Sequence, residues 1–312
     1  MATTANPTER FVDPLTTTRT SSLWRDTLGN ILRQRNARAG LLILGLLLFA
    51  AIFADVLAAY NPEKVLFDQG TKRLAAPCIH LFGCAANLPE HYFGIDANGR
   101  DEFSRVLHGA RISLQVGILT VGFAIVIGSF LGLIAGYAGG ILESLIMRTM
   151  DVLLVFPALL LAIAIVSALG PGLINAQLAI GIVAIPVYAR IMRSSVLSIR
   201  GSDFVTGSRA LGESAFGLVF RRILPNSLTP TIVAGTLGIA GAVLDVAALS
   251  FLGLGAQPPT AEWGSMVGQD RGYLFTAPYL VFFPGVALAM TVFGFNLLGD
   301  GLRDALDPRL NR

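Results

Sequence analysis

The chain has 312 residues, of which 54% are hydrophobic and only 14% are charged, and its mean hydropathy is +0.67. Soluble domains carry about 25% charged residues, so the long charge-poor runs place this chain in lipid and exclude an ordinary soluble protein. The formal net charge of +3 gives no indication of nucleic-acid binding, because the basic residues are spread along the loops that flank the apolar runs.

The chain begins with a polar, arginine-rich tail, residues 1–38, followed by a first predicted span over about 39–59. No short apolar region with a cleavage site precedes this span, so we expect an uncleaved anchor and no signal peptide. The span is long enough to cross roughly 30 Å of hydrocarbon. Asp55 lies near its outer end, where we interpret it as an interface residue and not as a transport group.

Residues 60–111 form a long segment in which acidic and basic residues balance, which is compatible with an extracytoplasmic loop. Both cysteines of the chain, Cys78 and Cys84, lie here. They form a disulfide if the loop is outside, where the compartment permits one, or remain two free thiols. A metal site from these cysteines with His80 and His91 is disfavoured, because the spacing matches no common zinc pattern. Residues 99–114 end the segment as an amphipathic helix predicted to lie along the interface.

The second predicted span, about 112–137, carries glycines four residues apart: Gly128, Gly132, Gly136 and, just beyond it, Gly140. Glycines at this spacing line one helix face and let a neighbouring backbone approach closely. That neighbour is either another helix of this chain or a helix of a second membrane subunit, and the sequence leaves both open.

The third predicted span, about 145–169, contains Arg148 and Asp151, whose spacing of three lets them pair on one helix face. We favour a structural ion pair over a gate or substrate contact. Pro157 interrupts the span and is expected to kink it. An uncharged connection, 170–175, leads to a fourth span that ends near Met192.

The loop 193–227 and its flanks hold the largest basic excess of the chain, which is typical of a cytoplasmic loop. Two short helices are predicted in it. Asp203 can cap the first helix and Gly212 can end it. Apolar residues at helical spacing mark the second helix, which Pro225 is expected to stop. They are Phe216, Val219, Phe220 and Ile223.

The fifth span, about 228–254, contains a lone acid, Asp245. A carboxylate inside a span is costly unless it is paired or hydrated, so Asp245 faces either a water-filled cavity or another helix. A sixth span, about 279–298, returns the chain inside, where residues 301–312 close it. The sequence thus predicts an all-α membrane protein of six spans with both termini in the cytoplasm, set by the basic inner segments.

The inner loop resembles the coupling-helix motif of ABC importer permeases, which reads Glu-Ala-Ala, three residues, Gly, nine residues, Ile-x-Leu-Pro. Gly212 takes the glycine position and Leu224-Pro225 follow at the expected distance. The Glu-Ala-Ala positions read Thr206-Gly207-Ser208, and Arg222 replaces the isoleucine. Together with the stretches 93–114, 248–266 and 295–308, the motif resembles the second permease subunit of dipeptide/oligopeptide importers across nearly the whole chain.

This resemblance implies the type I importer fold over 112–300, in the bacterial inner membrane. It also implies several partners: a homologous permease forming a heterodimer, two ATP-binding subunits and an extracytoplasmic substrate-binding protein. The residues it assigns to ATPase coupling are Asp203, Thr206, Gly207, Ser208, Leu211, Gly212, Glu213, Ser214 and Pro225. Candidates for the translocation pathway are Asp245, Asp151 and Arg148.

The chain lacks the signatures of an enzyme. Its two lysines, Lys64 and Lys72, follow Glu63 and Thr71, so no phosphate-cradling Gly-Lys-Ser/Thr loop exists, and we expect no cofactor or metal. One rival interpretation is an ion-coupled secondary transporter that uses Asp245 and Asp151 as ion carriers. Another is a structural scaffold. Relatives of the resembled class carry dipeptides, longer peptides, glutathione, nickel chelates or haem, and no residue here separates these substrates.

Overall fold

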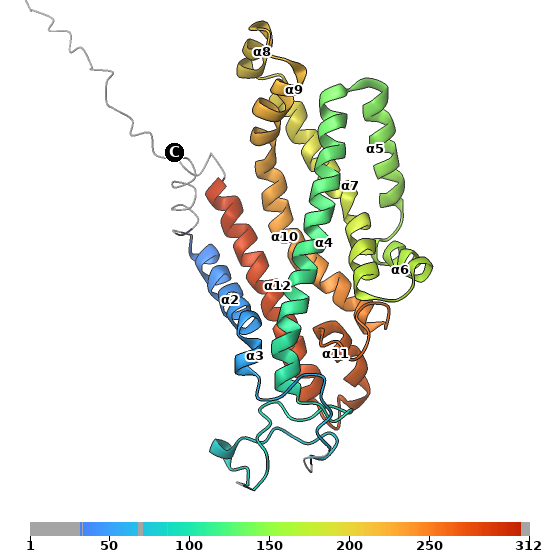
Figure 1. Ribbon diagram of the computed structural model, residues 1–312. Coiled ribbons are helices and arrows are strands. Elements are labelled where there is room, and N and C mark those ends of the chain that lie inside the picture. The colour runs from blue at the N-terminus through green and yellow to red at the C-terminus, as the bar shows by residue number, and fades with distance from the viewer. Residues whose placement is uncertain (1–31, 33, 68–70, 86, 307–312) are drawn as a thin grey trace, which may run out of the picture.

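The computed structural model describes residue 32 and residues 34–67, 71–85 and 87–306. Most of the predicted N-terminal tail and the last part of the C-terminal tail therefore lie outside the described residues. The described part is helical (Figure 1), and its two β-bridges, Cys78 with His91 and Ile95 with Asp101, are isolated.

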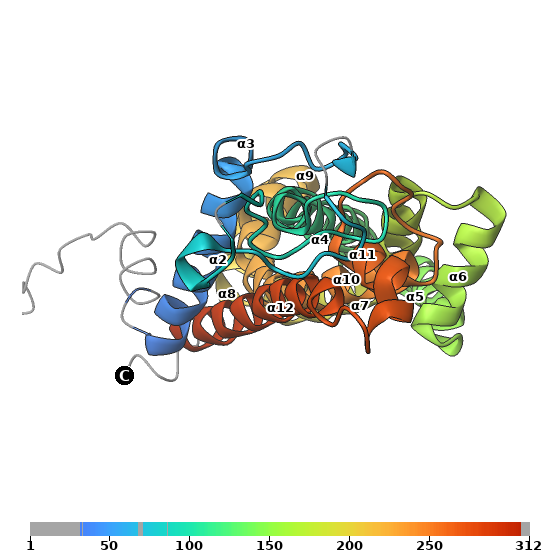
Figure 2. The ribbon, with the colours of Figure 1, turned by 90° about the horizontal axis from the view of Figure 1, so that it is seen from below.

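The long helices run roughly side by side, with α2 and α6 on opposite sides of the molecule (Figures 1 and 2). The elements that carry the membrane region are α2 (Arg35–Ile52), α4 (Glu102–Ala138), α5 (Gly140–Val155), α6 (Ala158–Leu169), α7 (Leu173–Arg200), α10 (Leu224–Phe251) and α12 (Tyr279–Leu306). Shorter elements connect them: α3 (Ala54–Leu57), η2 (His80–Phe82), α8 (Asp203–Ala210), α9 (Ala215–Gly217), the π-helical η3 (Leu218–Ile223), α11 (Trp263–Asp270) and η4 (Arg271–Tyr273).

Five helices of the described chain are long and apolar enough to cross a membrane, and a sixth span results if α5 and α6 are counted as one. These two helices meet at a bend of 93°. Pro157 lies in this break. It accounts for the break, because its ring and missing N–H prevent a continuous helix. The number and order of the six predicted spans therefore agree with the structure when the bent pair is counted as one span.

The helix predicted over residues 99–114 forms from Glu102 onward, but it is not a separate element. It is the first part of α4, which is continuous for 37 residues. Asp101 starts this helix, because its side chain accepts a hydrogen bond from the backbone N–H of Ser104 at 2.8 Å, the usual role of an N-cap aspartate. Glu102 and Arg105 are buried in the first turn, so the charges that suggested an exposed polar face point into the protein.

The core lies where α4, α7 and α10 pack together. Gly128, Gly132 and Gly136 form the α4 side of the contact with α7, and a Cβ at any of them would meet residues of α7. This assigns three of the four spaced glycines to packing within the chain. Gly140 has open space around it.

The segment that precedes α4 is held by buried polar groups at the end of the bundle opposite α8. Asp96 pairs with Arg100 at 2.7 Å and lies 3.7 Å from Arg105, and all three side chains are buried. Burial, together with the negative charge of Asp96, raises the pKa of Asp270 in α11 to about 6. Because α11 connects the fifth and sixth spans, this cluster joins two distant parts of the chain.

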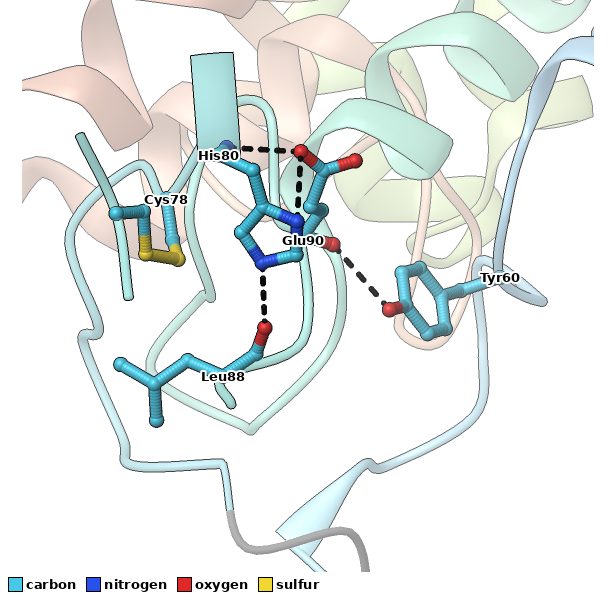
Figure 3. The surroundings of a disulfide bond; sticks show 6 residues. Tyr60, Cys78, His80, Leu88 and Glu90 are labelled. Atoms are coloured by element: carbon cyan, nitrogen blue, oxygen red, sulfur yellow. Dashed lines mark hydrogen bonds and ion pairs between the residues drawn. A yellow bond between two sulfur atoms is a disulfide. The ribbon is translucent and has the colours of Figure 1, made fainter. Parts of the chain in front are cut away.

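A disulfide joins Cys78 and Cys84, whose Cα atoms are 5.3 Å apart (Figure 3). Glu90 braces the same loop, since its carboxylate accepts from the backbone N–H of His80 at 2.8 Å and its carbonyl accepts from the Tyr60 hydroxyl at 3.2 Å. Among the described residues no group of His, Cys, Asp or Glu could hold a metal ion.

Candidate functional site

The loop between α7 and α10 projects from one end of the bundle as the short helix α8 (Figure 1). The residue before the helix, Ser202, occupies the N-cap position, so the prediction that Asp203 caps it is wrong. Ser202 makes no side-chain cap, and its hydroxyl donates instead to the carbonyl of Ile199 at 2.7 Å. Asp203 lies in the first turn, where a carboxylate is favoured by the helix dipole.

One buried side chain attaches α8 to the membrane helices. Val205 is fully buried and packs in a cluster with residues of α4, α7 and η3. These are Leu133, Met192, Val196, Leu218 and Ile223. Since α8 contributes no other buried residue, Val205 fixes the position of the helix while leaving its remaining surface open. Val205 is not one of the motif positions, so the sequence analysis missed it. An isolated valine in a polar stretch could have indicated a buried contact.

Apolar side chains are exposed at the start of α8 and in the turn that follows it. Leu211 is 91% exposed, Phe216 is 72% exposed and Phe204 is 49% exposed. Gly212 ends α8, as predicted, with φ +82°, a left-handed conformation that strongly favours glycine. No atom lies near the position of its missing Cβ, so the glycine is required by backbone conformation and not by close packing within this chain.

The turn after Gly212 is fixed by polar contacts. Glu213 accepts a hydrogen bond from Arg222 Nε at 3.1 Å and so pairs with the residue that replaces the motif isoleucine. Ser214 caps the following turn by accepting from the N–H of Gly217 at 3.2 Å. The loop therefore contains its own carboxylate–guanidinium pair.

Pro225 does not stop the second helix as predicted. The chain continues as one apolar helical run from Ala215 to Phe251, with Pro225 near the start of α10. The run widens to π-helical geometry over η3, directly before the proline. We attribute the continuity to this wide turn, which accommodates a residue that has no N–H to donate.

The three motif positions in α8 differ in their exposure. Thr206 is exposed, and its hydroxyl donates to the carbonyls of Ser202 at 3.2 Å and Asp203 at 3.0 Å. Gly207 is exposed with open space at its Cβ position, while Ser208 is half-buried and its carbonyl accepts from the N–H of Glu213 at 3.1 Å.

The predicted pairing of Arg148 with Asp151 is wrong. Asp151 instead pairs with Arg190 of α7 at 2.6 Å, and Arg148 is exposed. A tertiary partner on the neighbouring helix therefore replaces the local one. Asp245 is half-buried in α10 and has neither an ion pair nor a hydrogen bond within the described residues. The structure does not bring Asp245 together with the charged residues of α5.

Comparison with known proteins places the chain in a family. Residues 128–312 match the family described as the inner membrane component of binding-protein-dependent transport systems, and residues 22–77 match the N-terminal transmembrane domain of oligopeptide transport permease C. The chain belongs to this family of ABC importer permeases. It is accordingly a multi-pass component of the bacterial inner membrane, and such permeases work with ATPase and substrate-binding partners.

Several relatives align with nearly the full chain. It is 45% identical to the dipeptide transport system permease protein DppC of Alkalihalophilus pseudofirmus, over 93% of this chain and 91% of that relative. It is 45% identical to the di/tripeptide transport system permease protein DppC of Pseudomonas aeruginosa, over 88% and 89%. It is 41% identical to the glutathione transport system permease protein GsiD of Pectobacterium atrosepticum, over 92% and 91%.

A solved structure shares the fold. An inward-facing structure of the MetNI methionine ABC transporter superposes with a TM-score of 0.55 at 21% identity, covering 66% of this chain and 98% of that one. This likeness supports the expected type I importer fold.

Proposed function

We propose that the chain is one of two homologous permeases of an ATP-driven importer for dipeptides or short oligopeptides. In this assembly the two permeases form the pathway, two ATP-binding subunits attach on the inner side, and a binding protein delivers substrate from outside. The names of the 45%-identical relatives support short peptides as the substrate. Glutathione, itself a small peptide, is the alternative that the relative from Pectobacterium atrosepticum supports.

The observation that carries the proposal is the construction of α8. It is held by one buried residue, Val205, and presents the exposed Phe204, Leu211 and Phe216 at the end of the bundle. Exposed apolar groups in one small region are typical of a protein-docking surface. We assign this surface to a cleft of one ATPase, whose closure moves α8 as a lever and shifts the bundle between inward-open and outward-open states.

The same assignment orients the chain. The end that carries α8 faces the cytoplasm together with both termini, and the disulfide-bearing segment lies outside. The arginine-rich composition of the inner segments supports this orientation, because cytoplasmic loops carry an excess of arginine and lysine. Asp151, Arg148 and Asp245 remain candidates for the pathway, because ionisable groups within spans tend to serve transport.

The test uses the chain co-purified with its candidate partners and reconstituted in lipid. ATP hydrolysis is expected to rise when binding protein loaded with a dipeptide is added, and to stay at its basal rate with empty binding protein. Uptake driven by a proton gradient, without co-purification of any ATPase, would favour an ion-coupled transporter instead. Comparing dipeptide with glutathione in the same assay separates the two substrates.

A further inference from the structure

A polar cavity of about 430 Å³ lies between α5 and α7. Three arginines and two acids contribute to its lining. They are Arg148, Arg190, Arg193, Glu143 and Asp151. The volume lies within the range of about 300–1,000 Å³ found for small-ligand sites.

The cavity contains one more positive charge than negative. Asp151 pairs with Arg190 at 2.6 Å, and Glu143 accepts from Arg193 Nε at 2.6 Å. Arg148 pairs with no carboxylate among the described residues, and it lines the same cavity. A guanidinium without a paired anion beside two satisfied ion pairs leaves the cavity suited to one added negative group.

The position of these charges excludes direct contact with lipid chains. Asp151 lies three turns into α5, and Arg190 lies nearly three turns before the end of α7. The side chain of Asp151 is 58% exposed and that of Arg190 is 52% exposed. Half-exposed charges at this depth are costly in hydrocarbon, so this face of α5 and α7 borders water or protein.

We infer that the cavity is a binding site for the carboxylate of a short peptide, with the Arg148 guanidinium as its anchor. A guanidinium binds a carboxylate through two parallel hydrogen bonds, which gives both charge and geometry. The carboxylates of Asp151 and Glu143 lie in the same cavity and offer acceptors to the peptide N–H groups. This inference rests on the proposed function and adds a substrate-contacting residue within the pathway. A lipid phosphate offers the same anionic chemistry, and the experiment distinguishes the two.

The test uses the reconstituted transporter with Ser144→Cys as a reporter, because Ser144 lines the cavity and its replacement leaves Arg148 in place. The native Cys78 and Cys84 are joined to each other, so the new residue is the only free thiol of this chain. A charged, water-soluble thiol reagent is expected to label it in the absence of nucleotide. Labelling is read from the mass of this chain.

Millimolar dipeptide is expected to slow the labelling severalfold, and the same dipeptide with an amidated C-terminus is expected to have no effect. Adding Arg148→Gln should abolish the protection. The matched control is Thr149→Cys, an exposed neighbour on α5 that does not line the cavity, whose labelling should not respond to peptide. Equal protection by the amidated peptide, or protection that persists with Arg148→Gln, would overturn the inference.

Two further outcomes also overturn it. Labelling that depends on the fraction of anionic lipid in the vesicles, and not on peptide, would assign the site to a lipid phosphate. Absence of labelling in every state would place the partner permease over the cavity. A failure of the proposed function can be told apart from a failure of this inference. If the proposed function is wrong, the unaltered transporter shows no peptide-dependent ATP hydrolysis. With the proposed function intact, Arg148→Gln should reduce uptake severalfold while the stimulated hydrolysis remains.

Discussion

Gly212 is the residue at which backbone conformation and docking are most closely linked. Its φ is +82°. A left-handed conformation costs a residue with a branched side chain about 1–2 kcal/mol, whereas asparagine tolerates it. We therefore expect Gly212→Val to abolish peptide uptake while the chain still inserts in the membrane, and Gly212→Asn to retain substantial uptake. Measuring uptake beside the amount of membrane-inserted chain checks this. Equal loss in both variants would instead show that bulk at the docking surface is decisive.

Glu213 and Arg222 provide a second test at this scale. The pair is partly exposed, so its loss should change the unfolding free energy by less than about 1 kcal/mol. We expect Glu213→Gln to weaken the peptide-stimulated ATP hydrolysis much more than it weakens the folded chain. A double-mutant cycle with Arg222→Gln measures the coupling between the two residues. Additive effects would exclude a role for the pair.

Asp270 predicts a pH dependence of stability. Its pKa of about 6 in the folded chain lies above the ordinary value of 3.8, so the protonated carboxyl favours the folded state. This contribution is fully present below the ordinary pKa and is lost as the pH rises through the folded pKa, with an upper limit of about 3 kcal/mol. Thermal unfolding of the purified chain across this pH window measures it. Asp270→Asn should flatten this dependence, and an unchanged slope would contradict the assignment.

One buried valine, Val205, holds the helix α8 against the membrane helices. Val205→Ala removes two buried carbon atoms and should cost about 1.6 kcal/mol, from a value of about 0.8 kcal/mol for each. The backbone amides of α8 should then exchange hydrogen roughly tenfold faster, with reduced coupling. Leu211→Ala, at a 91% exposed residue, should reduce coupling without changing the exchange. Identical exchange in both variants would show that Val205 does not anchor the helix.

The contact between α4 and α7 depends on small residues. A side chain at Gly132 would meet the backbone of Ala189 and the Cβ of Met192. Gly132→Leu should therefore destabilise the bundle by about 1–3 kcal/mol. Gly122→Leu, on the same helix but in open space, is the control. The measurement is the thermal unfolding midpoint of each variant, and we expect a lower midpoint for Gly132→Leu than for Gly122→Leu. A similar midpoint for both would contradict the packing role of Gly132.

The sequence predicted the elements that depend on summed local properties. Apolar length predicted the spans, and the ring of Pro157 predicted the break between α5 and α6. What it missed depends on tertiary partners. The spacing of Arg148 and Asp151 suggested a local pair, but Arg190 of α7 pairs with Asp151 instead. Likewise, the charged start of α4 was interpreted as an exposed surface, but Arg105 is buried and donates to the carbonyls of Pro62 and Pro259, which come from distant segments.

At the scale of the whole molecule, the two ends of the bundle differ in construction. The end that carries α8 holds this helix through one buried side chain, Val205, and leaves the rest of its surface open. The opposite end is fixed by buried ion pairs and by the packing of α11 against α10 and α12. In the proposed mechanism, a motion of α8 would therefore act against an end of the bundle that these contacts hold in place. The candidate site was only partly predictable, because the motif located α8 but not the residue that holds it.

The disulfide between Cys78 and Cys84 also places an order on the biogenesis of the chain. In the proposed orientation the bond can form only after Cys78 and Cys84 have been exported, since the cytoplasm keeps thiols reduced. In a newly made chain, the oxidation state of these two sulfur atoms therefore reports which side of the membrane the first loop has reached.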